Sequence, residues 1–495
     1  MSGLHTVHVR VNDAATGQPT SCRVRFTDPG GRYYPPFGHP AAVTGPDRNA
    51  LEYEGNVLLS ANAHLCAYID GGCEISLPPG PIHVEITKGF EYRPIQTVVD
   101  QPAGKMAMRF TLERWADLRG ERWHAGDIRC HDLTPHAALL EGAAEDLAVV
   151  NLLAWRGRQF VAFSGQQPAL EKAGCQVVVN TFNTHRILGQ LALLNCHRIV
   201  FPLTFGAPDG PDSWTLGDWC DQCHRKQGLV VWSGLGHRGL IPYGEAFAQF
   251  VLGKVDALEL PLLTAGLLRD WYTMLDANLR VPLASGSAKA GPIDPLGLPR
   301  TYARLKEGEA FSYKAWIEAV RAGRTFVSAG PLLEFSVNGQ EPGAAIDLPA
   351  PGRVAVAARA RSMFPFERLE IVINGVAVAG VEAVGKAPYE AKVEGNLDIA
   401  ESGWMSARCW GKSVWKAGGK SDDCLAHTSP IYLNVAGAPH TADAIKLAHL
   451  TDQLNQMLHW AEHGAQYETA AQRDALTGVF RTALAELIRK AGLQQ

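Results

Sequence analysis

The sequence lacks the features of several broad protein classes. No run of about 18 apolar residues is present, which excludes a membrane-spanning helix. The start lacks a basic stretch followed by an apolar one, so we expect no secretory signal peptide. Neither sign of charge is in marked excess, because 46 Lys and Arg stand against 50 Asp and Glu. Since nucleic-acid-binding proteins usually carry a basic face or tail, we expect neither a nucleic acid nor a membrane as a partner.

Cysteine is too sparse for a disulfide-dependent fold. The 10 cysteines are scattered over 495 residues and form no dense framework, so we expect reduced, buried thiols in a cytoplasmic protein. Cys220 and Cys223 are spaced like two metal ligands, but a zinc site would need a second Cys or His pair nearby. We therefore expect these two thiols to pack against a core.

The length and the local patterns predict several domains. A chain of 495 residues is too long for one ordinary core, so two to four domains are expected. Residues 1–112 and 331–436 both show short alternating runs separated by Gly- and Pro-containing turns, which predicts a β-sandwich in each. Residues 437–495 contain two amphipathic stretches and predict a helical segment. Amphipathicity does not decide whether this segment packs on the rest of the chain or forms a dimer, so the oligomeric state stays open.

Residues 113–330 have a different pattern, in which helical segments alternate with short apolar strands. The helix-like segment Asp218–Gln227 precedes the apolar run Gly228–Trp232, and Glu245–Gly253 precedes Val255–Leu260. Such alternation is typical of a parallel sheet or a β/α barrel, in which the chemistry sits at the carboxyl ends of the strands. The sequence therefore predicts a multidomain α+β protein, with a central β/α barrel between two β-sandwiches and a helical tail.

The strongest local signal lies between Gly126 and His131, in the order Gly-Asp-Ile-Arg-Cys-His. Residues two apart in a strand face the same side, so a Gly-Asp-x-His-x-His motif at a strand end would aim two imidazoles at one metal. Here Arg129 takes the first imidazole position, and a guanidinium has no lone pair to give a metal. A salt-bridged strand end is the competing interpretation. Asp127 and His131 stay candidate catalytic residues.

Longer segments also resemble a known family. The most specific segment is Ala322–Leu333, and weaker support comes from Val9–Gly17, Gly89–Pro94, Ala144–Leu147, Leu252–Ala257, Pro299–Tyr302 and Ala426–Pro430. With these segments the chain resembles the CehA/McbA metallohydrolases of the PHP (polymerase and histidinol phosphatase) superfamily over nearly its whole length. The resemblance implies a distorted, PHP-like β/α barrel in which a metal such as zinc, manganese or iron activates water to hydrolyse esters, carbamates or phosphate esters.

Most positions where the resemblance places metal ligands carry other residues. The replacing residues are Arg129, Thr181 or Phe182, Gln190, Ser233 and Ala288. A metal site needs about three convergent protein ligands, and only His131 clearly remains. The resemblance therefore implies that the inherited site holds no metal and that the chain is a non-catalytic or impaired hydrolase-fold protein, a pseudoenzyme.

The substitutions also favour a positively charged pocket. An arginine can hold a carboxylate or a phosphate with two parallel hydrogen bonds. Our hypothesis is that Arg129, with Lys289 and Arg238 as helpers, binds a small anionic molecule without a metal.

Two alternatives stay open. The first is an active hydrolase of ester, carbamate or phosphoester bonds, with a metal site rebuilt from His131 and histidines near the barrel mouth. The histidines expected in loops there are His124, His136, His185 and His237, of which the last three join His131 as candidate ligands. The second alternative is a metal-free enzyme in which His131 acts as an acid or a base beside Arg129.

Overall fold

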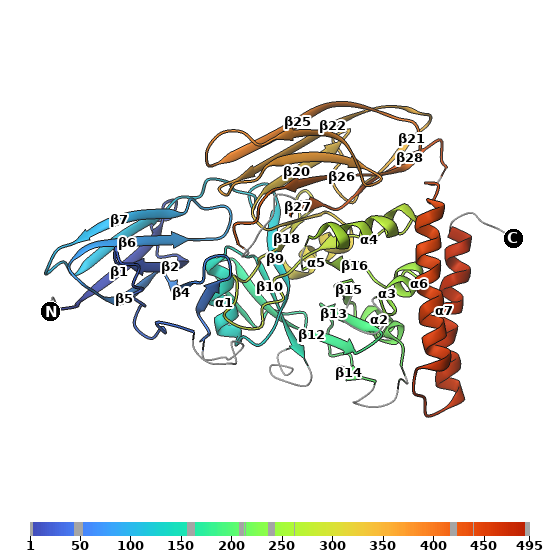
Figure 1. The fold of residues 1–495 in the computed structure, drawn as a ribbon, viewed down its shortest axis with the longest axis horizontal. Coiled ribbons are helices and arrows are strands. Elements are labelled where there is room, and N and C mark those ends of the chain that lie inside the picture. Colours follow the sequence, from blue (N-terminus) through green and yellow to red (C-terminus); the bar gives the residue numbers. More distant parts are fainter. Residues whose placement is uncertain are drawn as a thin grey trace.

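The computed structural model describes residues 3–43, 53–155, 164–206, 212, 214–235, 243–261, 263–415, 423–438 and 440–490. Within these ranges the protein is mostly β, with seven helices and a large curled sheet. Figure 1 shows the N-terminal strands at one end, the curled sheet in the centre, the C-terminal strands beside it and two long helices at the other end.

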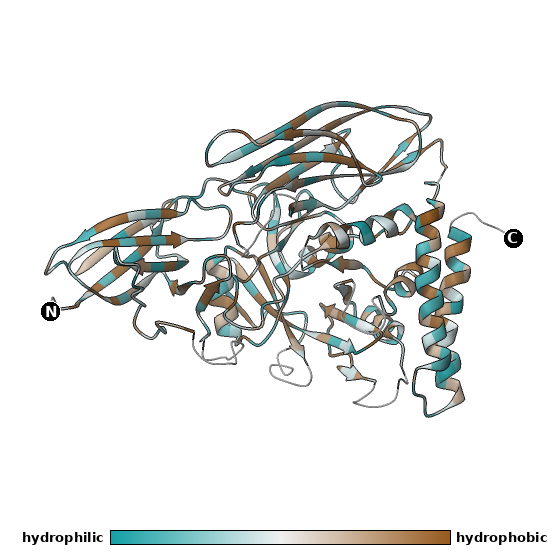
Figure 2. Cartoon of the chain, viewed as in Figure 1, coloured by the Kyte–Doolittle hydropathy of each residue, from teal (hydrophilic) through white to brown (hydrophobic). Residues whose placement is uncertain are grey.

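The first eight strands form two sheets that share one core. These strands are β1 (His5–Asp13), β2 (Ser21–Thr27), β3 (Asn56–Leu59), β4 (His64–Asp70), β5 (Gly72–Leu77), β6 (Gly80–Thr87), β7 (Ile95–Gln101) and β8 (Ala107–Leu112). One sheet has the order β5-β1-β8 and the other the order β3-β4-β2-β6-β7. Because alternate side chains of a strand face the same side, Val7 and Val9 of β1 meet Val24 and Phe26 of β2 in one apolar cluster. Figure 2 shows the alternation of apolar and polar residues along these strands.

The central part alternates strands and helices. The strands are β9 (Trp123–Cys130), β10 (Val149–Trp155), β11 (Leu170–Lys172), β12 (Cys175–His185), β13 (Gly189–Leu194), β14 (Thr204–Phe205), β15 (Leu229–Ser233), β16 (Ala257–Glu259), β17 (Leu283–Ala284), β18 (Arg300–Arg304) and β19 (Thr325–Ser328). The helices are α1 (Pro135–Ala144), α2 (Leu216–Arg225), α3 (Ala246–Val251), α4 (Ala265–Asp276) and α5 (Tyr313–Arg321). Four of these helices begin where a hydroxyl side chain caps the first turn, at Thr134, Thr215, Thr264 and Ser312.

The curled sheet contains two groups of parallel strands and closes on itself. Strands β9, β10 and β12 are parallel to one another, as are β15, β16 and β17, and the antiparallel strand β13 joins the two groups. After β17 the chain returns to β9, where a parallel bridge pairs Cys130 with Lys289. The backbone N–H of His131 donates to the carbonyl oxygen of Lys289 at 2.6 Å. The helix–strand alternation expected from the sequence is therefore found, with β13 as an unexpected antiparallel insertion.

The C-terminal strands form a three-stranded sheet and an extension of the curled sheet. They are β20 (Leu332–Val337), β21 (Ala345–Leu348), β22 (Gly352–Ser362), β23 (Arg368–Ile373), β24 (Val376–Glu382), β25 (Tyr389–Ile399), β26 (Gly403–Trp410), β27 (Cys424–Thr428) and β28 (Ile431–Val435). Strands β20, β22 and β25 form the separate sheet, and β27 pairs with β19 of the curled sheet. Asn374 and Gly375 both have positive φ angles, 48° and 82°, and form the hairpin turn between β23 and β24.

The last two helices, α6 (Ala444–His463) and α7 (Ala470–Lys490), pack on the central part. Leu450 and Leu454 of α6 and Phe480 of α7 belong to the same buried cluster as Trp271 and Met274 of α4. The helical segment therefore packs on α3 and α4 of its own chain. No described helix is both long and apolar enough to span a membrane.

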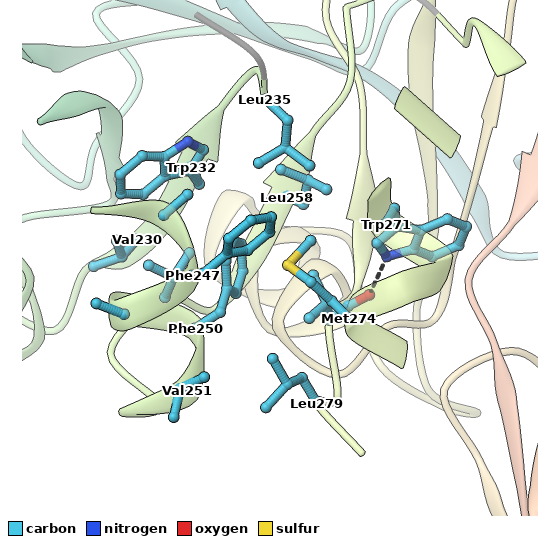
Figure 3. Close-up of a cluster of buried hydrophobic side chains, with 14 of the residues drawn as sticks. Val230, Trp232, Leu235, Phe247, Phe250, Val251, Leu258, Trp271, Met274 and Leu279 are labelled. Carbon is cyan, nitrogen blue, oxygen red and sulfur yellow. Dashed lines mark hydrogen bonds between the residues drawn. The ribbon is translucent and has the colours of Figure 1, made fainter. Parts of the chain in front are cut away.

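The core under α3 and α4 fixes these helices on the curled sheet. Figure 3 shows Trp232 of β15 and Leu258 of β16 facing Phe247 and Phe250 of α3, with Met274 of α4 beside them. The indole nitrogen of Trp271 donates to the carbonyl oxygen of Val281 at 3.0 Å, which ties α4 to the segment before β17. Burial of these large side chains holds the strand ends in place.

Close packing explains the glycine that precedes Asp127. A Cβ atom at position 126 would lie 2.5 Å from Cζ2 of Trp316, which is fully buried on α5. We predict that Gly126→Ala lowers the free energy of unfolding by about 1–3 kcal/mol, because the buried indole has no room to move. Urea denaturation measures this loss. Gly395→Ala in β25, where nothing lies within 4 Å of the added atom, is the matched control. Equal stability of the two variants would contradict the packing argument.

Candidate functional site

The candidate site lies at the end of the curled sheet where β9, β10, β12 and β16 finish, which we name the mouth. The side chains that meet there are Arg129 and His131 from the end of β9, Trp155 from β10, Phe182 from β12 and Glu259 from β16. Parallel strands bring their carboxyl ends to the same edge of a sheet, so residues far apart in the sequence become neighbours.

An ion pair occupies the centre of the mouth. Nε of Arg129 donates to both carboxylate oxygens of Glu259, at 3.0 and 2.9 Å. The Glu259 side chain is 0% exposed and the Arg129 side chain 13% exposed, so this carboxylate depends on the guanidinium for its neutralisation. The guanidinium carbon also lies 5.1 Å from the centre of the Phe182 ring. Among the described residues, no group hydrogen-bonds the two terminal nitrogens of Arg129.

His131 lies beside this pair as a neutral imidazole. Its Nδ1 lies 3.2 Å from the carbonyl oxygen of Leu153. A carbonyl only accepts, so Nδ1 carries the proton and the lone pair is on Nε2. Burial, and secondly the charge of Arg129, lower the pKa of His131 to about 3. The ring lies 5.0 Å from Phe182 and 5.9 Å from Trp155, measured between ring centres.

Asp127 is buried beneath the mouth and holds the loop that follows β17. One carboxylate oxygen accepts from the backbone N–H groups of Arg129 and Ser287, at 2.9 and 3.0 Å. The other oxygen accepts from the Ser287 hydroxyl at 2.5 Å and from the Gly297 N–H at 2.7 Å. Burial raises the pKa of Asp127 to about 6, although these four hydrogen bonds oppose the rise. Both oxygens are therefore engaged in joining β9 to residues 285–297.

The Lys289 side chain contacts Glu141 of α1. Its ammonium nitrogen lies 3.5 Å from a carboxylate oxygen of Glu141 and donates to the carbonyl oxygen of Asp294 at 2.9 Å. Both Lys289 and Glu141 are buried. Each of these two cations at the sequence-predicted site therefore has its own buried carboxylate. The expectation of a surplus positive charge is therefore wrong for Arg129 and Lys289. The carboxylates of Glu259 and Glu141 neutralise these two cations, and both acids are far from them in the sequence.

The expectation that His124, His136 and His185 lie in loops is wrong. His124 lies within β9, His136 lies in the first turn of α1, and His185 is the last residue of β12. For His124 and His185 the reason is that β9 and β12 include polar residues and extend beyond their apolar runs. His237 and Arg238 lie outside the described residues.

These histidines also have separate surroundings. Nε2 of His185 lies 2.8 Å from a carboxylate oxygen of Asp212, and the His124 ring stacks on Phe311 at 4.5 Å. His136 is exposed. Within the described ranges, no three side chains of His, Cys, Asp or Glu form a group suited to a metal ion. The described members of the proposed rebuilt set, His131, His136 and His185, therefore do not make such a group by themselves.

The cysteine pair of α2 packs into the core, as the sequence predicted. Cys220 and Cys223 are fully buried, and the sulfur of Cys223 lies 3.4 Å from that of Cys196. Burial raises the pKa of both thiols of α2 well above the usual value. These thiols are therefore inert packing groups.

Sequence reasoning missed Glu259 as a residue of the site. One signal was present, because Glu259 is a charged residue near the end of the apolar run Val255–Leu260. A carboxylate at the carboxyl end of a strand in an α/β protein points to the functional edge.

Comparisons with known proteins do not identify the family. No protein-family model and no curated protein matches the sequence. The chain has some likeness to PsfC from Pseudomonas syringae PB-5123, with 12% identity, a TM-score of 0.32, and coverage of 40% of this chain and 88% of that one. It also has some likeness to the lesion-specific endonuclease PfuEndoQ from Pyrococcus furiosus, with 13% identity, a TM-score of 0.26, and coverage of 41% and 55%. TM-scores this low carry no argument about fold or function.

The buried imidazole makes stability depend on pH. In the unfolded chain a histidine takes up a proton near pH 6.5, whereas folded His131 does so only near pH 3. The unfolded state therefore binds more protons in this window, and stability falls as the pH drops from 6.5 toward 3. We predict that His131→Gln reduces the loss of unfolding free energy between pH 7 and pH 5 by about 2 kcal/mol, as measured by urea denaturation.

The control for this experiment is His8→Gln at an exposed position of β1. That variant retains His131 and should keep the wild-type difference between the two pH values. If His131→Gln loses as much unfolding free energy between pH 7 and pH 5 as the wild type does, the folded imidazole takes up its proton in this pH range, which contradicts a folded pKa of about 3.

The Arg129–Glu259 pair should be strongly coupled. Removing one partner leaves the other charge buried, so we predict that Glu259→Gln lowers the free energy of unfolding by about 3–5 kcal/mol. The double variant Arg129→Met, Glu259→Leu should lose less unfolding free energy than the sum of the losses in the single variants Arg129→Met and Glu259→Leu. A double-mutant cycle by urea denaturation measures this coupling. The exposed pair Arg353–Asp398, joined at 2.9 Å, is the control and should show much weaker coupling. Simple additivity at Arg129 and Glu259 would count against the pair.

Proposed function

We propose that this chain is a CehA/McbA-like protein in which a PHP-like β/α barrel, flanked by two β-sandwiches, binds a small anionic molecule and does not hydrolyse it. The closed sheet, with its two groups of parallel strands, and the position of the Gly126–His131 motif at its mouth support this fold. The arginine in place of a ligand histidine, paired with an internal carboxylate, supports the loss of metal-dependent hydrolysis.

The geometry of Arg129 is the observation on which the proposal depends. Glu259 holds the Nε edge of the guanidinium, while the terminal nitrogens have no partner among the described residues. Two such nitrogens match the two oxygens of a carboxylate in position and charge. Glu259 thus orients the guanidinium, and its outer edge is the part that a ligand would contact.

The charge of the mouth indicates which anion it would take. Arg129 and Glu259 offset each other, and His131 is neutral at pH 7 because its pKa is about 3. A site with no surplus charge favours a monoanion over a dianion, because the second negative charge would meet Glu259 without compensation. The rings of Phe182 and Trp155 beside His131 favour an apolar or aromatic body. A small aromatic or aliphatic carboxylate meets these requirements.

Benzoate is a suitable probe of this proposal. We predict that benzoate binds the wild-type chain in isothermal titration calorimetry and that Arg129→Lys weakens the affinity by about tenfold. Lysine keeps a positive charge for Glu259 but lacks the second edge of the guanidinium. Arg353→Lys in β22, where the side chain is 72% exposed, is the control and should bind as the wild type does. The same affinity in Arg129→Lys and wild type would overturn the assignment of the carboxylate to Arg129.

A turnover screen tests the non-catalytic part of the proposal. We predict that esters, carbamates and phosphate esters are hydrolysed by the wild-type chain no faster than by His131→Ala. Turnover that His131→Ala abolishes would instead support the alternative, an active hydrolase with a rearranged histidine metal site. In that case residues beyond the described ranges, such as His237, would have to complete the ligand set.

A further inference from the structure

Two adjoining cavities lie at the other end of the curled sheet from the mouth. Their volumes are about 520 and 290 Å³. Asp256 and Pro282, which line the larger cavity, directly precede β16 and β17, so this cavity lies at the amino ends of these strands. Four residues line both cavities and make them two lobes of one groove: Asn278, Arg280, Tyr432 and Lys490.

Two cations of this groove have no close acidic partner. Arg280 is exposed, its guanidinium carbon lies 4.8 Å from the centre of the Tyr432 ring, and within the described ranges it forms no ion pair. The ammonium of Lys490 donates to the carbonyl oxygen of Val251 at 3.0 Å. Its nearest carboxylate belongs to Glu486 at 3.9 Å, and that carboxylate already accepts two hydrogen bonds from Arg489, at 2.6 and 2.7 Å.

The other charges lining the larger lobe are already paired. Arg321 and Asp256 form an ion pair at 2.6 Å, and Arg321 also donates to the carbonyl oxygen of Gly228 at 2.8 Å. The groove therefore carries about two uncompensated positive charges, those of Arg280 and Lys490, in a chain whose formal net charge is -4. Cations gathered in a hollow with low-dielectric walls concentrate the field there and attract anions.

The walls of the larger lobe are partly apolar. Phe250 and Leu279, which Figure 3 shows below the strands, line it together with Val255 and Pro282. The groove therefore offers a positive region shared by both lobes and an apolar region next to it. A ligand that fits has a compact doubly charged head and an uncharged organic body.

We propose that this groove binds a phosphate monoester, with the phosphate at Arg280 and Lys490 and the organic group in the larger lobe. A phosphate monoester carries about 1.5 to 2 negative charges at pH 7, which matches the two uncompensated cations. Arginine binds two phosphate oxygens in parallel, and lysine supplies a point charge. The site is separate from the mouth and does not depend on the function proposed for Arg129.

Phenyl phosphate and inorganic phosphate, titrated separately into the full chain in phosphate-free buffer of low ionic strength, test this proposal. We expect phenyl phosphate to bind one site per chain by calorimetry, and more tightly than inorganic phosphate because the ring enters the larger lobe. Arg280→Gln should weaken the phenyl phosphate affinity by about tenfold or more, and Lys490→Gln by about threefold. Arg280 is exposed and Lys490 half-buried, so both variants should fold.

Two matched variants show where the ligand binds. Arg353→Gln, an exposed arginine of β22, should leave the affinity unchanged, and so should Arg129→Lys at the mouth. Absence of binding at about 10 mM phenyl phosphate would overturn the proposal, as would an unchanged affinity in Arg280→Gln. Loss of binding in Arg129→Lys alone would place the phosphate at the mouth and also overturn it. Equal affinities for the two phosphates would overturn the assignment of the organic group to the larger lobe.

Discussion

The buried carboxylate of Glu259 requires a positive charge beside it. The residue that supplies this charge determines which side chains face the mouth. Arg129 supplies the charge from β9, so one ion pair connects the first strand of the curled sheet with β16. Burial, and secondly the charge of the guanidinium, lower the pKa of the neighbouring imidazole of His131 to about 3, so this imidazole is neutral at pH 7. A position that the resemblance assigns to a metal ligand is thus part of a compensated pair, and any ligand of the mouth would meet the outer edge of that pair.

The residues around this pair mainly hold the closed sheet together. Asp127 accepts four hydrogen bonds that join β9 to the loop after β17, and Lys289 pairs with Glu141 of α1 beside the same loop. Gly126 lies against the indole of Trp316, where no side chain fits. The Gly-Asp pair that first suggested a metal site therefore also packs against α5 and holds the loop after β17 by hydrogen bonds.

Local patterns in the sequence predicted much of the secondary structure, but they did not predict which strands or charged residues pair when these are far apart in the sequence. The helix expected at Asp218–Gln227 overlaps α2, and the apolar run Gly228–Trp232 overlaps β15, because regular periodicity reports a buried face directly. The antiparallel strand β13 was not expected, since its apolar run carries no mark of direction. Glu259 is 130 residues from Arg129, so their pairing depends on the order of strands in the closed sheet and not on any local motif. For the same reason, the sequence suggested a surplus of positive charge that Glu259 and Glu141 offset.

We propose that an arginine–glutamate pair replaces the metal at the mouth, and the metal content of the full chain is the measurement that tests this. The chain is incubated with zinc, manganese and iron salts, dialysed, and analysed by mass spectrometry for bound metal, next to His131→Ala. We expect a metal content far below one ion per chain in the wild type and no difference in His131→Ala. One zinc, manganese or iron ion per wild-type chain, lost in His131→Ala together with hydrolase activity, would contradict it.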